Sequence, residues 1–441
     1  MKKSLLLGAA AFAAMAYVGS ANAGDVKVGG YYMFRALSQD STLADDGNDD
    51  TRNWKHRLQV RTDFKASEKT HAHAILRILG SDMVENVDGQ AATGAGIQVN
   101  QAWLETEAWG IGLKVGEMPI GLNDNILVNN VDDEKGFGTI LLSKSFGDVT
   151  AILADVRVAD GTTIGTPTAQ DDMDLYVLSL LGSANPVNYQ VTGAYFDDQT
   201  AGDADDFWLA ATVGGDFSGV NATGTVIYEN GVDVAGNGQA QNDGFLGALR
   251  LKGKTGFGGW NAYGLYSSAD FDSIVGNNAH FSQTWDHGGP GAKDLLGDEG
   301  FASAQNSTTA NAADTENMWS IGAGLTFESA GWTINPMLDY AAVVDENPNN
   351  AAGGSQFKAD SAWGGTLALS TDIDKDTKLT LAGTYVDPDA NAGAKLDNMY
   401  NVSADVNEWS QKRGRSRPLF FLVLKIKKYH NKIYDRMTSN T

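Results

Sequence analysis

The sequence predicts an all-β fold, namely a transmembrane antiparallel β-barrel of about 16–18 strands with short periplasmic turns and long extracellular loops. Residues 24–407 form a series of short segments in which apolar and polar residues alternate. The connections between these segments alternate between short and long. The alternation of apolar and polar residues suits a barrel wall, because one face of each strand contacts lipid and the other contacts water. The alternation of short and long connections suits the two ends of the barrel, which face the periplasm and the cell exterior.

The N-terminus has the three parts of a cleavable export signal. Lys2 and Lys3 supply positive charge, Leu5–Val18 supplies an apolar stretch, and Ala21–Ala23 supplies a small-x-small cleavage site. A membrane anchor is the weaker interpretation, because the apolar stretch is short and the cleavage site follows at once. We therefore expect residues 1–23 to be a signal peptide that exports the mature chain.

The composition argues against a small disulfide-stapled domain and suits a barrel. The chain has no cysteine, 52 glycines and 8 prolines, and 42% of its residues are hydrophobic. After residue 23 no segment reaches the roughly 18 apolar residues of a spanning helix. A barrel needs apolar residues only on the lipid-facing half of each strand.

The alternation that defines the strands is clear in 187–196, where Val187 and Tyr189 alternate with Asn188 and Gln190. A two-residue repeat places each set on its own face of a sheet. The eighteen predicted strands are 25–37, 52–66, 70–80, 97–109, 111–117, 136–146, 148–158, 172–182, 186–197, 206–216, 219–230, 244–253, 258–270, 316–328, 331–343, 360–371, 376–387 and 396–407.

The predicted connections fall into two classes. The short turns are 67–69, 110, 147, 182–185, 217–218, 254–257, 329–331 and 372–375. The long loops are 38–51, 81–96, 118–135, 159–171, 198–205, 231–243, 271–315, 344–359 and 388–395. Gly, Asn, Asp and Ser in the short class accept the dihedral angles of tight turns. The 271–315 loop is long enough to hold another hairpin, so 16 or 20 strands are alternatives.

Two predicted strands, 136–146 and 172–182, are apolar on both faces. One interpretation is a buried or strongly lipid-packed strand, and the other is a contact between subunits of an oligomer. The sequence does not decide between them.

The first three predicted strands place basic residues on the face opposite their lipid-facing set. A charge on the lipid face would cost about 2–4 kcal/mol at the bilayer midplane, so these side chains are expected to point inward. They form a predicted basic wall of Arg35, Lys55, Arg57, Arg61 and Arg77. Such a wall would set ion selectivity in a water-filled barrel. The alternative is that these residues only satisfy neighbouring acids and plug a narrow barrel.

The loop after the fifth predicted strand is more apolar than the others, with Ile120, Leu122 and Ile126–Val128. We expect a loop of this composition to fold into the barrel rather than extend into water. Through this loop and the strand rhythm of residues 24–407, the chain resembles the general diffusion porins of Gram-negative outer membranes.

That resemblance implies a homotrimer in the cell outer membrane that passes small hydrophilic solutes and ions passively. It also implies an inward third loop whose acids face a basic ladder; here the matching acids are Asp124, Asp132, Asp133 and Glu134. Porins with 16 strands are common in the family, whereas sugar-selective relatives have 18. A substrate-selective channel for sugars or carboxylates, and a non-conducting surface or adhesion barrel, are the alternative functions.

No cofactor, metal or catalytic site is predicted. Acidic loop segments such as 45–50 and 203–206 suit solvent exposure better than a calcium site, although divalent ions there could bridge to lipopolysaccharide. His71 and His73 are closer to ordinary interior residues than to a metal pair. No nucleophile, zinc or phosphate-binding pattern is present, so we expect a non-enzyme with no nucleic-acid partner.

Residues 408–441 differ from the rest of the chain. From Gln411 onward they hold nine Lys or Arg and one acid, whereas the whole chain carries a net charge of −23. Porins usually end on an aromatic residue of the last strand, and here the corresponding outward position is Glu408. We hypothesise that a frameshift near residue 407 replaced the native end; the alternative is a genuine basic extension.

Overall fold

The computed structural model describes residues 25–40, 51–78, 85–86, 97–129, 137–159, 173–198, 204–231, 243–268, 271, 318–344, 359–390 and 399–412. The predicted signal peptide, most of the long loops and the tail after Lys412 lie outside these residues. All secondary structure of the described part is β-strand. None of the described residues belongs to a helix that is long and apolar enough to cross a membrane.

The described part contains long strands and three pieces of two residues each. The long strands are β1 (Val26–Asp40), β2 (Thr51–Lys65), β3 (Thr70–Ile78), β5 (Ile97–Ala108), β6 (Ile111–Met118), β9 (Phe137–Phe146), β10 (Val149–Ala159), β11 (Met173–Ala184), β12 (Val187–Asp198), β13 (Ala204–Phe217), β14 (Val220–Gly231), β15 (Asp243–Thr255), β16 (Gly258–Ser267), β17 (Met318–Ser329), β18 (Trp332–Val343), β19 (Ala359–Asp374), β20 (Thr377–Ala390) and β21 (Met399–Lys412). The two-residue pieces are β4 (Glu85–Asn86), β7 (Gly121–Leu122) and β8 (Val128–Asn129).

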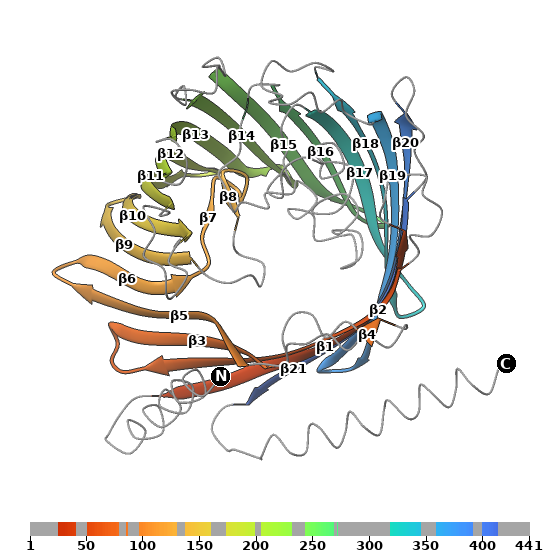
Figure 1. Cartoon of the computed structure of the whole chain (residues 1–441), viewed down its shortest axis with the longest axis horizontal. Helices are drawn as coiled ribbons and strands as arrows, with labels where there is room; N and C mark the ends of the chain where they lie inside the picture. The colour runs from red at the N-terminus through yellow and green to blue at the C-terminus, as the bar shows by residue number, and fades with distance from the viewer. Residues whose placement is uncertain are drawn as a thin grey trace, which may run out of the picture.

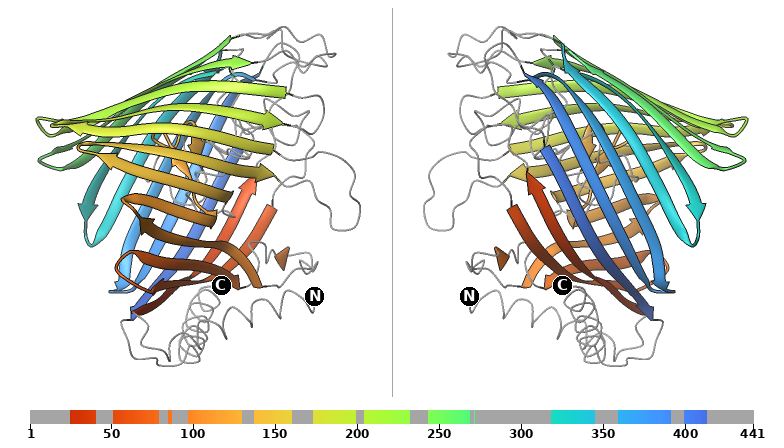
Figure 2. Two further views of the ribbon diagram at one scale, coloured as in Figure 1. Left: turned by 90° about the vertical axis from the view of Figure 1, so that its left-hand side faces the viewer. Right: turned by 90° about the vertical axis from the view of Figure 1, so that its right-hand side faces the viewer.

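The long strands form one antiparallel sheet that curves round on itself (Figure 1). Each long strand pairs with the next along the chain, and β21 pairs back with β1 from Val28↔Lys412 to Asp40↔Tyr400. The sheet has 19 strands including the short β4, so eighteen long strands make up the wall in the described part. Figure 2 shows these strands slanting side by side across the wall.

The predicted all-β barrel of antiparallel strands is confirmed, and every predicted strand corresponds to one of the long strands. The main difference lies at the end of the sheet. β21 continues to Lys412, five residues beyond the predicted boundary at 407, because Glu408–Lys412 extends the ladder with β1. β4, β7 and β8 were not predicted, because two residues are too few to show an alternation of apolar and polar side chains.

Tight turns join the strand pairs at one end of the sheet. Trp109-Gly110, Ser218-Gly219 and Ala330-Gly331 each connect two strands, and all six residues have positive φ, between 52° and 90°. Two consecutive left-handed residues make the type I′ turn, whose twist matches that of antiparallel strands. Glycine at the second position lowers the cost of this backbone shape.

The two faces of the wall differ in the way the alternation predicts. On β11, Tyr176, Leu178 and Leu180 are exposed, whereas Leu175 and Val177, which alternate with them, are buried. The exposed set continues onto β12, where the Tyr195 ring stacks on Tyr176 at 6.3 Å. The outer face is therefore largely apolar and open, as a wall in contact with lipid requires.

Candidate functional site

The segment after β6 enters the interior of the barrel. Its β7–β8 hairpin pairs through Gly121↔Asn129 and Leu122↔Val128 and lies inside the ring of strands (Figure 1). We call residues 119–129 the inner loop. The expectation that this loop folds inward is met by the described residues.

Apolar side chains fix the inner loop to the inner face of β10–β16. Ile120, Leu122 and Ile126–Val128 share a buried cluster with wall residues such as Leu175 and Val177. Burying one aliphatic side chain contributes roughly 1.5–3 kcal/mol, so the five from the loop contribute on the order of 10 kcal/mol. The hydrophobic effect therefore accounts for the docking of this loop.

The same cluster explains one of the two predicted strands that are apolar on both faces, namely 172–182. On β11, one set of apolar residues faces outward, and the other set, Leu175 and Val177, contacts the inner-loop cluster. The inward apolar face is thus covered from within the same chain. Trp208 and Phe196 extend the cluster along the wall with an edge-to-face contact at 6.3 Å.

The tip of the inner loop has an unusual backbone. Asn123, Asp124 and Asn125 have φ values of 51°, 62° and 61°. Asn and Asp adopt the left-handed region more readily than other residues with a Cβ, which explains this Asn-Asp-Asn sequence. Three such residues in succession still require contacts that hold them.

Polar contacts of Asn123 help to stabilise this left-handed backbone. Its backbone N–H donates to Gln190 Oε1 at 3.2 Å, and its Nδ2 donates to Thr212 Oγ1 at 3.2 Å. Thr212 also contacts Thr225 Oγ1 at 2.9 Å, while Gln190 Nε2 donates to Ser179 Oγ at 3.0 Å. The tip therefore rests on a strip of inward hydroxyl groups.

Asp124 forms an ion pair with Arg250 of β15, and both side chains are largely buried. Burial raises the pKa of Asp124, and the opposing attraction of Arg250 and Lys252 does not cancel this effect. For the Asp124 carboxylate, the loss of contact with water outweighs these attractions, as is common in partly buried ion pairs.

Strands β2 and β3 form the opposite wall (Figure 1). Charged residues such as Arg61 and Asp63 lie on this wall. Residues opposite one another in a ladder share a face, and the register pairs Arg61 with Ile75 and Asp63 with His73. The His73 ring stacks on Trp103 at 4.7 Å, and Trp103 contacts the interior cluster, so this face points inward.

The predicted basic wall is described only in part. Arg61 is exposed and Arg77, opposite Gln59 in the ladder, is buried. The backbone of Arg35, Lys55 and Arg57 lies in the β1–β2 ladder, where Arg35 stands opposite Lys55, but their side chains lie outside the described part.

Of the predicted loop acids, Asp124 is brought against Arg250 on β15, and no interaction with the predicted basic wall is described for it. Asp132, Asp133 and Glu134 lie outside the described residues. Arg250 was missed by sequence reasoning, although a signal was present: Arg250, Lys252 and Lys254 alternate with Leu249 and Leu251. Asn123 was missed because its role depends on backbone shape and a distant strand.

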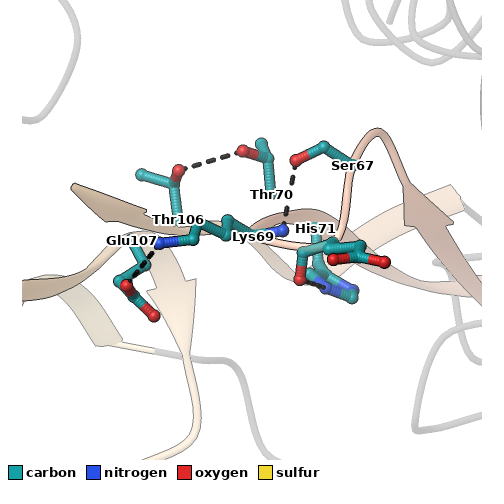
Figure 3. A network of polar contacts seen from close by, with 7 residues as sticks. Ser67, Lys69, Thr70, His71, Thr106 and Glu107 are labelled. Atoms are coloured by element: carbon teal, nitrogen blue, oxygen red, sulfur yellow. Dashed lines mark hydrogen bonds and ion pairs between the residues drawn. The ribbon is translucent and has the colours of Figure 1, made fainter. Parts of the chain in front are cut away.

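Near the turn between β2 and β3, further polar contacts cross between strands (Figure 3). Lys69 Nζ lies 2.7 Å from Glu107 Oε1, and Thr70 Oγ1 lies 3.0 Å from Thr106 Oγ1. Deeper on the same strands, His73 Nδ1 lies 2.7 Å from Asp63 Oδ1. The His, Asp and Glu side chains of the described part include no group of three that could hold a metal ion.

Comparison with solved structures identifies the fold. The structure is similar to crystal structures of OccK2 (OpdF) from Pseudomonas aeruginosa (TM-score 0.60, 12% identity, 88% of this chain and 99% of that chain) and OccK11 (OpdR) from the same species (0.58, 10%, 88% and 96%). It is also similar to OccAB4 from Acinetobacter baumannii (0.55, 13%, 89% and 99%). Similar structures include OccK2 with glucuronate and OpdK with vanillate.

No protein-family model matches the sequence, and no curated protein matches it. The likeness is thus one of fold: the chain has the β-barrel fold of outer-membrane porins.

Proposed function

We propose that the chain forms a water-filled channel in the outer membrane of a Gram-negative bacterium, through which small hydrophilic solutes and ions diffuse passively. The observation that carries this proposal is the contrast between the two faces of one wall. On β5 and β6 the outer face exposes apolar side chains such as Leu104 and Val115, whereas the inner face of the same strands carries the Glu105–Lys114 ion pair. The inner face of β2 carries Arg61 and Asp63. A barrel of about 16–18 strands is wide enough for an aqueous channel.

The inner loop supplies the restriction that a channel of this width needs. It docks on the inner face of β10–β16 and thereby occupies one side of the interior. Solutes would then pass between the inner loop and the wall of β2 and β3. Charged groups along such a path select ions by sign and orient polar solutes. Asp132, Asp133 and Glu134 would add negative charge on the loop side.

A selective channel for small carboxylates is a second candidate. The similar OccK2 and OpdK structures were solved with glucuronate and vanillate, and both of these molecules carry a carboxylate. Arginine binds carboxylates through two parallel hydrogen bonds, and Arg61 is exposed on the β2–β3 wall. The identity to those proteins is 10–13%, so this candidate rests on the chemistry of the wall.

The proposal includes the setting of the channel. Export by the signal peptide of residues 1–23, a homotrimeric assembly and contact of the outer loops with lipopolysaccharide would follow for such a protein. Nothing in the proposed transport needs a cofactor or a chemical step.

Liposome swelling tests the proposal and separates its two forms. Purified protein is folded into liposomes, and uptake rates are compared for neutral sugars of increasing size and for sodium glucuronate. A general channel gives rates that fall steadily with solute size. A carboxylate-selective channel admits glucuronate faster than a neutral sugar of equal size, and absence of uptake for every solute contradicts both forms.

A further inference from the structure

We propose that Asp124 and Arg250 are a positioning pair, whose contact holds the tip of the inner loop against β15 and thereby fixes the position of the constriction. Asp124 then belongs to the anchor of the loop and not to the acids that face the solute path. The part that concerns the solute path rests on the proposed function, whereas the anchoring of the loop does not.

Apolar packing docks the inner loop on the wall. The five apolar side chains of the inner loop bury against β10–β16 and supply the affinity for the wall. Apolar contacts have little directional preference, because the hydrophobic effect depends mainly on the area removed from water. They bring the loop to the wall without fixing where its polar tip lies.

Directional polar contacts fix the tip of the inner loop. Asn123, Asp124 and Asn125 are all left-handed, and this shape turns Asp124 toward Arg250 while Asn123 contacts Thr212. Asn123 reaches β12 and β13, and Asp124 reaches β15, so the tip is held at two separated points of the wall. Two directional contacts determine an orientation that apolar packing leaves open.

The charge of Asp124 is compensated by Arg250. Its Oδ1 meets the Arg250 guanidinium, and its Oδ2 is buried with no hydrogen-bond partner in the described part of the chain. Lys252, on the same face of β15, adds a second positive charge nearby. A carboxylate that is buried and compensated in this way projects little field into the interior. Selection by charge would therefore fall to residues outside this pair, such as Arg61.

A cysteine reporter measures the anchoring without any need for conductance. The chain has no cysteine, and Val128 of the docked inner loop is only 1% exposed, so Val128→Cys adds one buried thiol of similar size. The folded full-length protein in liposomes is treated with a water-soluble maleimide at fixed pH. In the Val128→Cys parent we expect slow labelling, because the thiol reacts only when the loop opens.

Charge reversal then tests the pair. Arg250→Glu or Asp124→Arg alone places like charges together, and each should raise the labelling rate by about ten-fold or more. The combination Asp124→Arg with Arg250→Glu should restore a rate within about two-fold of the parent. Lys254→Glu reverses a charge on the same face of the same strand, two residues beyond Lys252, and should leave the rate unchanged.

The outcomes separate cleanly. Labelling that stays slow in Arg250→Glu, or that stays fast in the reversed pair, overturns the positioning role. Where Arg250→Glu does not fold, Arg250→Gln replaces it and should still accelerate labelling. The labelling rate and solute uptake test different proposals. If the reversed pair restores slow labelling but the protein passes no solute, the anchoring role of the pair is supported and the proposed channel function is contradicted.

Discussion

Tyr263 of β16 donates a hydrogen bond of 2.5 Å to Asp339 of β18, across the intervening strand β17. Gly322 lies between them, opposite Tyr263 in one ladder and opposite Asp339 in the other. A Cβ at Gly322 would collide with the Tyr263 ring and with Asp339 Oδ1. The absence of a side chain on β17 is therefore what allows the two polar groups to meet inside the barrel.

Gly322→Ala should destabilise the folded barrel. The added methyl must push aside the Tyr263 ring or the Asp339 carboxylate, and overpacking of this kind costs about 1–3 kcal/mol. Urea unfolding of the detergent-folded protein measures the loss. Gly264→Ala on the neighbouring strand is the matched control, since its nearest atoms would lie 3.9 Å from the new Cβ. Equal stability of the two variants would contradict the proposed crowding.

Leu127→Ala should weaken the docking of the inner loop. Leu127 is 2% exposed within the interior cluster, and truncating a buried leucine to alanine typically costs about 2–5 kcal/mol. The free energy of unfolding in urea should fall by an amount within that range. Leu338→Ala removes the same atoms from a side chain that is 66% exposed on the outer face, and should cost much less in detergent. If Leu127→Ala lowers the free energy of unfolding no more than Leu338→Ala does, the docking of the inner loop is contradicted.

Arg57→Gln and Arg61→Gln should shift ion selectivity toward cations. Each substitution removes one positive charge from the wall formed by β1–β3 while keeping a polar side chain of similar length. The measurement is the reversal potential across a bilayer with a salt gradient. Lys144→Gln, which removes an exposed positive charge from β9, is the comparison. An unchanged reversal potential in both arginine variants would remove them from the constriction.

The stability contributed by Asp124 should depend on pH. Burial holds its pKa above the ordinary value in the folded state, so protonation favours the folded form. That contribution is fully present below the pKa of the unfolded chain, about 3.9, and is lost as pH rises through the higher folded pKa. Unfolding free energies of the wild type and of Asp124→Asn, compared from pH 3 to 7, check this sign. If the stability of the wild type relative to Asp124→Asn increases as pH rises, the predicted sign is contradicted.

Much of the wall could be predicted from the sequence, because a two-residue period reports directly which residues share a face of a strand. The tight turns at Gly110 and Gly331 were also predictable, because glycine adopts positive φ at little cost. The turn at Ser218-Gly219 was predicted one residue too early, at 217–218. The inward loop was predicted from its apolar composition. In each case the signal is local, within one strand or one turn.

The partners of the inner loop were not predictable in the same way. The contact of Asp124 with Arg250 joins positions 126 residues apart in the sequence, and the alternation of charges on β15 does not say which loop they meet. The inward face of β11 was ambiguous for the same reason: Leu175 and Val177 show that something apolar covers them, but not what. The extension of β21 to Lys412 follows from pairing with β1, which is the strand farthest away in the sequence.

The proposed function depends on a continuous aqueous path through the barrel, and single-channel recording tests it most directly. Purified protein, refolded and shown to be rich in β-structure, is added to a planar lipid bilayer in potassium chloride. We predict discrete, uniform current steps whose size grows with the salt concentration. If the protein is shown to be folded and inserted but no current steps are recorded, the proposed channel is contradicted.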